Sequence, residues 1–317
     1  MDVSICIVSW NTKDLLRKCI QSIIDKTFKL EYEIVVVDND SKDGSFDMVK
    51  ELYPYYRIIQ SGRNVGFAKA NNIAAAHASG KYILYLNPDT EMLSNAIYGM
   101  HKYMEKNDDY GAVGCKILNT DGTIQYTCAR SFPNPYKQFC ELSGINRIFP
   151  NIPAFSSIEM HYWDHKESRD IDCISGACMM VRKEVVDALN GFDENIFMYA
   201  EDVDLCYRIK KKGWKIYYLA DEIIMHHEGA STKKATNKYF STLQLRDSSV
   251  YFLAKHYGAA KARHYKAAVF VGSAIRLLTI PVYLLIKNKT GRKAEFRLSE
   301  YIVKYTALMK WSISLFR

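Results

Sequence analysis

The most constraining feature of this sequence is the alternation of short apolar runs with amphipathic stretches over its first part. Four runs have the β-branched, apolar composition of buried strands: 3–9, 33–37, 57–60 and 82–86. Three stretches between them have apolar residues at helical spacing or are rich in alanine: 12–24, 43–52 and 64–78. Strand and helix in alternation predict right-handed crossovers. We therefore predict an α/β fold with a doubly wound, mostly parallel sheet.

Polar clusters follow three of these strands, at 9–11, 38–41 and 87–89. Ligands of doubly wound sheets bind beyond the carboxyl ends of the strands. We therefore expect the three clusters to converge on one ligand site. Asp38 could accept hydrogen bonds from a ribose or a base, although Asx residues are also typical of plain turns.

Asp89 follows a buried strand and the rigid Pro88. Mg²⁺ and Mn²⁺ prefer hard oxygen ligands, usually one or two carboxylates together with phosphates of the substrate. The sequence thus favours a divalent cation at Asp89, with a Pro-Asp turn as the alternative. Gly66 precedes a predicted helix, whose free N–H groups could bind an anion.

Three acids, Glu201, Asp202 and Asp204, open a helix that ends at Gly213. Acids in a first helical turn often only complement the helix dipole. Three of them after the apolar stretch 197–199 suggest that one carboxylate faces a pocket, where it could accept a proton from an attacking hydroxyl. His226 and His227 follow another strand-like run and could bind metal or phosphate, or could lie on the surface.

The charge is divided unevenly along the 317 residues. Residues 231–317 carry 17 Lys and Arg against 3 Asp and Glu, whereas residues 1–230 carry 26 and 32. A basic tail on an acidic body indicates an anionic surface as partner, and the apolar stretches of the tail favour lipid over nucleic acid. We expect a catalytic domain over 1–236 and a basic, aromatic helical region over 237–317.

The stretch 267–286 is long enough to span a bilayer core, but Arg276 lies near its middle. Basic residues flank it on both sides. We expect a monotopic anchor in the cytoplasmic leaflet, with packing of both tail helices against the catalytic domain as the alternative.

The eight cysteines form no C-x-x-C pair, and Met1 leads directly into a strand without signal-peptide features. We expect a reducing, cytoplasmic location, peripheral on the inner face of the cell membrane.

An ordered set of motifs covers about residues 3–232: IVSWN, VVVDNDSKDGS, RNVGFAKANN, LYLNPDT, ISGACMMVRKE, GFDENIFMYAEDVDLCYRIKKKGW and HHEGAS. Together they resemble the family-2 glycosyltransferases, in particular the rhamnosyltransferase-like enzymes of bacterial polysaccharide biosynthesis. The resemblance implies a GT-A fold, with a Rossmann-like nucleotide-binding half and an acceptor half. It does not cover the tail, which would be a C-terminal helical extension.

The resemblance also implies residue roles. Asp202 matches the catalytic base, Asp89 the metal-bearing acid, and His226 a histidine at the metal or diphosphate, with His227 as the second choice. Asn87 stands where many relatives carry Asp. Glu201 and Asp204 would be acceptor-side or accessory residues. The donor nucleotide would contact residues at the strand ends and the glycine loop: Ser9, Asn11, Asp38, Asn39, Asn64, Gly66, Asn71 and Asn87.

The implied function is inverting transfer of a sugar, with dTDP-rhamnose as the first choice of donor, to a hydroxyl of a glycan or lipid-linked acceptor. Mg²⁺ or Mn²⁺ would be the cofactor, and no nucleic acid is expected as partner. A catalytically inactive glycan-binding or scaffold subunit is the alternative. Nucleotidyltransferases and dehydrogenases are disfavoured, because the loop at 9–12 lacks their glycine-rich phosphate motifs.

Overall fold

The computed structural model describes residues 1–227, 240–289 and 298–314, except for the side chains of 240 and 282–289. The chain divides into two compact units. The first unit contains Met1–Phe132 and Asp164–Thr236, and the second contains Pro133–Trp163 and Asn237–Arg317. The segment 133–163, which we expected within a domain over 1–236, thus groups with the C-terminal helices. The expected boundary at 236 lies outside the described residues.

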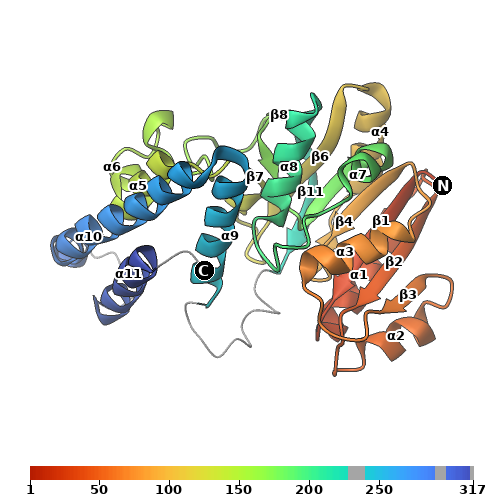
Figure 1. Ribbon diagram of the computed structural model, residues 1–317. Coiled ribbons are helices and arrows are strands. Elements are labelled where there is room, and N and C mark those ends of the chain that lie inside the picture. Colours follow the sequence, from red (N-terminus) through yellow and green to blue (C-terminus); the bar gives the residue numbers. More distant parts are fainter. Residues whose placement is uncertain (228–239, 290–297, 315–317) are drawn as a thin grey trace. The chain divides into compact units, whose positions relative to one another are not determined.

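A mixed sheet forms the centre of the first unit (Figure 1). Its strands are β1 (Val3–Ser9), β2 (Tyr32–Asp38), β3 (Arg57–Gln60), β4 (Tyr82–Leu86), β5 (Thr90–Met92), β6 (Tyr110–Leu118), β8 (Arg169–Asp170), β10 (Cys178–Arg182) and β11 (Lys215–His226). Their order is β3-β2-β1-β4-β10-β6-β11-β5, and β8 pairs with β11. The predicted strands β1 to β4 are all parallel, whereas β10 runs antiparallel between β4 and β6.

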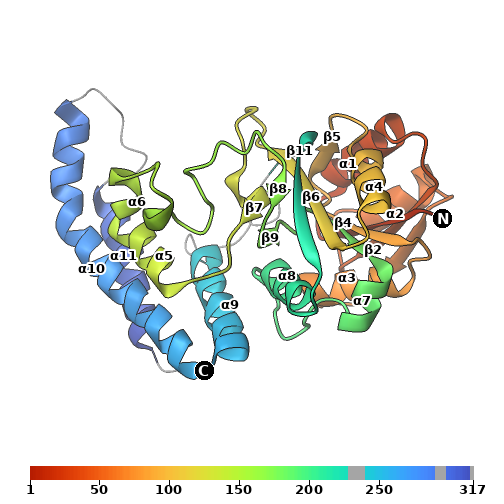
Figure 2. The same ribbon diagram turned by 90° about the horizontal axis from the view of Figure 1, so that it is seen from above.

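Helices cover both faces of this sheet. They are α1 (Lys13–Lys26), α2 (Ser45–Leu52), α3 (Phe67–Ala76), α4 (Ala96–Lys106), α7 (Lys183–Leu189) and α8 (Glu201–Lys211). In Figure 2, α1 and α4 lie on one face, and α3, α7 and α8 on the other. The buried residues of α1 are Leu16, Cys19, Ile20 and Ile23, which recur at the helical period that predicted this element. The predicted doubly wound α/β fold is confirmed.

The chain order places a topological switch point between β1 and β4. From β1 the chain proceeds to β2 and β3 on one side, and then returns to β4 on the other side. Ser9 at the end of β1 pairs in register with Asp38 at the end of β2. The polar residues that follow β1, β2 and β4 therefore meet at the edge where sheets of this type bind ligands.

The second unit is helical and contains α5 (Pro135–Ser143), α6 (Ile145–Ile148), the 3₁₀ turn η2 (Pro153–Phe155), α9 (Phe240–Tyr257), α10 (Ala259–Lys289) and α11 (Leu298–Ile313). The long helix α10 packs against α5, α9 and α11 (Figure 2). Gly272 of α10 permits close approach to α5, because a Cβ there would lie 2.9 Å from the Cβ of Leu142.

A buried polar network joins α5 to the C-terminal helices. The Arg246 guanidinium donates to Gln138 and, at 2.9 Å, to the hydroxyl of Tyr265. The Tyr265 hydroxyl donates to the same Gln138 oxygen at 2.9 Å. Contacts between residues so far apart in sequence explain why the grouping of 133–163 was not predicted.

Among the described helices, none is both long and apolar enough to cross a membrane. Within the stretch 267–286, Val269, Ser273 and Arg276 are buried inside the second unit, whereas Leu278 is 80% exposed. The side chains of 282–286 lie outside the described residues. All eight cysteines are buried and free, as expected of cysteines that act as small apolar residues.

Candidate active site

Hydrogen bonds join the loops that follow β1 and β2 at the carboxyl ends of these strands. The amide of Asn11 donates to the Ser41 hydroxyl at 2.9 Å, and the amide of Lys42 donates to Asn11 Oδ1 at 2.7 Å. The hydroxyl of Ser9 is fully buried and lies 3.0 Å from that of Thr12. Ser9 and Asn11 thus fix the shape of these loops, and Asn11 does so with a positive φ of 55°.

Asp38 is the last residue of β2. One of its carboxylate oxygens accepts a hydrogen bond, and the other has no partner among the described residues. Oδ1 accepts the Ser41 amide at 3.0 Å, whereas Oδ2 is buried and unpartnered. Because buried acceptors are almost always hydrogen-bonded, an unpartnered carboxylate oxygen at a strand end is a place where a ligand donor fits.

Asn39 and Asn64 shape the loop that leads to α3. Asn39 donates to Asn64 Oδ1 at 3.0 Å and accepts the Val65 amide at 2.9 Å. Gly66 has a φ of +85°, and a Cβ there would lie 2.7 Å from the ring of Phe197. Glycine is therefore required at the start of α3. Asn71 differs from these residues, because its side chain donates back to the Phe67 carbonyl within the helix at 3.0 Å.

Asp89 and His226 lie together at the end of β4. Asp89 Oδ1 and His226 Nε2 are 3.1 Å apart, and both side chains are buried. Asn87 Nδ2 lies 3.2 Å from the same ring nitrogen, while Asn87 Oδ1 is buried without a partner in the described part of the chain. A carboxylate, an imidazole and an unpartnered amide oxygen are the donor types that suit Mg²⁺ or Mn²⁺.

Gln125 orients the His226 ring. Its Nε2 donates to Asn119 at 3.2 Å, which turns Oε1 toward His226 Nδ1 at 2.8 Å. The ring therefore carries a proton on Nδ1, and its Nε2 faces Asp89 Oδ1. If a cation were bound here, Nε2 would hold it through its lone pair, the usual arrangement for a metal-ligating histidine. The described residues contain no cluster of three or more His, Cys, Asp or Glu that could hold a metal ion, so phosphate oxygens would have to complete the coordination.

His227 is engaged elsewhere. Its Nε2 lies 2.8 Å from Glu91 Oε1 and its Nδ1 lies 2.9 Å from the Thr120 hydroxyl. Its backbone amide donates to the Asp89 carbonyl at 2.8 Å. His227 therefore supports Asp89 through its backbone, while its ring faces away from the Asp89–His226 pair. Residues 228–231 of the HHEGAS motif lie outside the described residues.

The three acids of α8 have three different environments. Asp202 Oδ2 accepts the Arg130 guanidinium at 2.5 Å and the Gly176 amide at 3.0 Å. Oδ1 accepts the Val203 amide at 2.7 Å. Asp204 is fully buried and pairs with Arg208 at 2.6 Å. Arg208 also donates to the carbonyls of Leu189 and Gly191, so this pair is structural.

Glu201 is buried, and its Oε2 has no partner among the described residues. Burial, together with the neighbouring Asp202 carboxylate, raises the pKa of Glu201 to about 8. Glu201 therefore holds its proton at neutral pH and cannot accept another. Among the described contacts of the three acids, Asp202 Oδ1 is the carboxylate oxygen with capacity for a further hydrogen bond.

Three residues at this site were not identified from the sequence. Arg130 lies in the two-residue strand β7 (Ala129–Arg130), which pairs with β9 (Cys173–Ile174). Gln125 precedes the 3₁₀ turn η1 (Tyr126–Cys128). Asn72 accepts the Phe192 amide at 2.8 Å and donates to its carbonyl at 2.9 Å. The first two lie in an irregular segment, where no periodic pattern indicated their position.

Comparison with known proteins identifies the family of this chain. Residues 4–189 match the model of glycosyl transferase family 2, and residues 145–288 match glycosyl transferase family group 2. The chain therefore belongs to glycosyl transferase family 2, and it is an enzyme of the glycosyltransferase class.

Its relatives include the N-acetylglucosaminyl-diphospho-decaprenol L-rhamnosyltransferase of Mycobacterium tuberculosis, 28% identical over 63% of this chain and 67% of the relative. The rhamnosyltransferase WbbL of Escherichia coli is 29% identical over 75% of this chain and 88% of the relative.

Solved structures with a similar fold include a mannosyltransferase of Pyrobaculum calidifontis in complex with GDP-mannose and Mn²⁺. It has a TM-score of 0.61 and 15% identity, over 98% of this chain and 88% of that one. Staphylococcus aureus TarS in complex with UDP-GlcNAc has a TM-score of 0.53 and 15% identity, over 85% of this chain and 72% of that one. The expected GT-A fold is thereby confirmed.

Proposed function

We propose that this enzyme transfers a sugar, with rhamnose from dTDP-rhamnose as the first choice, from a nucleotide-sugar donor to a hydroxyl of a glycan or lipid-linked acceptor with inversion. The observation that carries the proposal is that one family-2 chain combines Asp202, the Asp89–His226 pair, and Asp38, whose Oδ2 has no partner among the described residues. The rhamnosyltransferase relatives support the choice of sugar, and the decaprenol-linked substrate in one of their names supports the lipid-linked acceptor. They give no support to the inactive scaffold that we considered as the alternative.

At the donor end, Asp38 Oδ2 is placed to accept a hydrogen bond from the nucleoside. Asp89 and His226 would hold Mg²⁺ or Mn²⁺, with Asn87 beside them. When bound, the cation supplies Lewis-acid stabilisation of the charge that develops on the departing nucleoside diphosphate.

At the acceptor end, Asp202 Oδ1 takes the proton of the attacking hydroxyl. The hydroxyl oxygen forms a bond to the anomeric carbon as the bond from that carbon to the diphosphate oxygen breaks. A single displacement of this kind inverts the anomeric configuration without a covalent enzyme intermediate. Arg130 and the Gly176 amide hold Oδ2 and thereby orient Oδ1 as a positioning pair.

The enzyme would act at the inner face of the cell membrane, with the second unit on the lipid. Two observations support this proposal. The tail is strongly basic, and several apolar side chains of α10 and α11 are exposed, among them Val271, Leu278, Ile302 and Val303.

Thermal unfolding with a panel of nucleoside diphosphates, with and without Mn²⁺, tests the donor site. A ligand at 100 times its Kd stabilises the native state by about 2.7 kcal/mol. We expect the largest rise in Tm with dTDP and Mn²⁺.

Asp89→Ala should lose the Mn²⁺-dependent part of the rise in Tm. Asn87→Ala should lose less of it, because a neutral amide is the weaker ligand. An unchanged Mn²⁺-dependent rise in Asp89→Ala would remove this residue from the metal site.

A further inference from the structure

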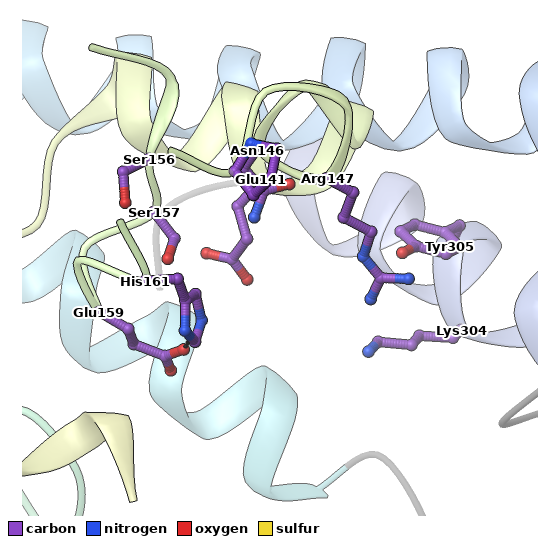
Figure 3. A pocket seen from close by; sticks show the side chains of 10 residues that line it. Glu141, Asn146, Arg147, Ser156, Ser157, Glu159, His161, Lys304 and Tyr305 are labelled. Carbon is purple, nitrogen blue, oxygen red and sulfur yellow. Dashed lines mark ion pairs between the residues drawn. The ribbon is translucent and has the colours of Figure 1, made fainter. Parts of the chain in front are cut away.

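A pocket is lined entirely by residues of the helical unit (Figure 3). It has a volume of about 350 Å³. Its lining comes from α5, α6, the stretches before and after η2, and α11: Glu141, Asn146, Arg147, Pro150, Ser156, Ser157, Glu159, His161, Lys304 and Tyr305. Figure 3 shows Ser157, Glu141 and His161 on one side of the open space, and Arg147, Lys304 and Tyr305 on the other.

Acidic and basic side chains both line this pocket. Of its two carboxylates, Glu159 pairs with His161 at 2.8 Å, and Glu141 pairs with the buried Arg246 behind it at 3.6 Å. Arg147 and Lys304 contribute two positive charges from α6 and α11. Because both carboxylates already have partners, a bound anion would be attracted by the Arg147 guanidinium and the Lys304 ammonium.

Uncharged hydrogen-bonding groups complete the lining. The hydroxyls of Ser156 and Ser157 are buried, at 2% and 1% exposure, and have no partner among the described residues. Buried hydroxyls normally have a partner, so these two require one from a ligand or a water molecule. Burial raises the pKa of Tyr305, so its phenol stays protonated and can donate.

We propose that this pocket binds a phosphate group, either of a polyprenyl phosphate or of a free phosphate compound. A guanidinium, an ammonium and hydroxyl donors around a small cavity match the charge and the several acceptor oxygens of a phosphate. A cavity of this size holds a head group rather than a polymer. The proposal concerns the second unit alone and does not depend on the proposed transfer reaction.

Binding of inorganic diphosphate to the full chain in EDTA, measured by calorimetry, tests the soluble source, because EDTA removes metal-dependent binding at the donor site. Vesicles of phosphatidylcholine, with and without a polyprenyl phosphate, test the lipid source. Arg147→Gln and Lys304→Gln each remove one charge from the pocket, and Ser157→Ala removes one hydroxyl. Lys310→Gln is the matched control, since Lys310 is exposed on the same helix as Lys304 but does not line the pocket.

We expect Arg147→Gln and Lys304→Gln to weaken binding about tenfold or more, Ser157→Ala to weaken it several-fold, and Lys310→Gln to change it less than about twofold. Pocket-dependent binding of diphosphate identifies a free phosphate compound, and pocket-dependent binding of doped vesicles alone identifies the lipid. Both results support a phosphate site. The proposal is overturned if neither probe binds, if the pocket variants bind as the wild type does, or if Lys310→Gln has the same effect as Lys304→Gln.

Discussion

The difference between Glu201 and Asp202 is set by their partners rather than by their positions in the sequence. Both open α8, and both are buried. Asp202 receives a guanidinium and two backbone amides, which stabilise its charge. Glu201 has the Asp202 carboxylate as its neighbour and an oxygen without a partner in the described part of the chain. The raised pKa of Glu201 therefore follows from its burial and from the neighbouring carboxylate.

This difference predicts a pH-dependent stability. Between about pH 4.5 and pH 8, the folded state holds a Glu201 proton that the unfolded state has lost, so the free energy of unfolding falls as the pH rises through this window. The amide of Glu201→Gln cannot ionise, so the free energy of unfolding of this variant should not fall for this reason as the pH rises. We expect its Tm at pH 8 to exceed that of the wild type by at least about 2 °C, the effect of roughly 1 kcal/mol in a domain of this size.

The Tm values of Glu201→Gln and the wild type should differ least near pH 5. Thermal unfolding followed by circular dichroism at pH 5 and at pH 8 measures this difference. An equal difference in Tm at pH 5 and pH 8 would show that Glu201 is ionised in the folded protein.

At the scale of elements, the loop into α3 depends on one glycine. Gly66 combines a φ of +85° with a close approach to Phe197. Gly62 has a φ of +76°, and apart from its chain neighbours no atom of the described residues lies within 4 Å of an added Cβ. An alanine is strained at either position, but only at 66 does it also collide with a ring. We expect Gly66→Ala to lower stability by about 1–3 kcal/mol more than Gly62→Ala, in line with the usual cost of overpacking.

Gly66→Ala should also weaken nucleotide binding, because displacement of Phe197 moves the start of α3. Chemical denaturation and nucleotide titration of both variants provide the measurements. Equal destabilisation by the two substitutions would mean that Phe197 moves aside without cost.

The elements that could be predicted are those with a local pattern. Strands β1, β3 and β4 have the predicted bounds, because apolar runs bounded by polar residues fix them without reference to the rest of the chain. The parallel crossovers then bring Asp38 and Asp89 to one edge of the sheet.

The partners of the site residues could not be predicted. Arg130 reaches Asp202 across 72 positions of sequence, and Gln125 reaches His226 across 101. Both are single polar residues in a segment without periodicity, and only the folded chain shows which atoms they meet. The same reason applies to the grouping of 133–163 with the tail, which depends on buried contacts such as Arg246 with Gln138.

At the scale of the whole molecule, the basic, partly apolar tail predicts binding to anionic membranes. Leu278 is 80% exposed and Val303 is 54% exposed, so replacing both with glutamate should leave the fold intact while opposing contact with an anionic bilayer. We expect Leu278→Glu/Val303→Glu to lose most of its co-sedimentation with phosphatidylglycerol vesicles.

Leu52→Glu on α2 is the control, because Leu52 is 56% exposed but lies in the first unit. It should sediment with the vesicles as the wild type does. If the wild type itself stays in the supernatant, the second unit is not a membrane-binding element.

The most direct test of the account is the effect of Asp202→Asn on transfer and on donor binding, measured side by side. The substitution keeps the shape of the side chain but removes the proton acceptor, and a general base contributes about 10²–10⁴ in rate. With Mn²⁺, a dTDP-sugar and an acceptor, the wild type should release dTDP and form a product of inverted anomeric configuration by NMR. The kcat of Asp202→Asn should be lower than that of the wild type by about 10²–10⁴, while its Kd for dTDP stays within about twofold of the wild-type value. Turnover by Asp202→Asn close to that of the wild type, or a product of retained configuration, would contradict the account.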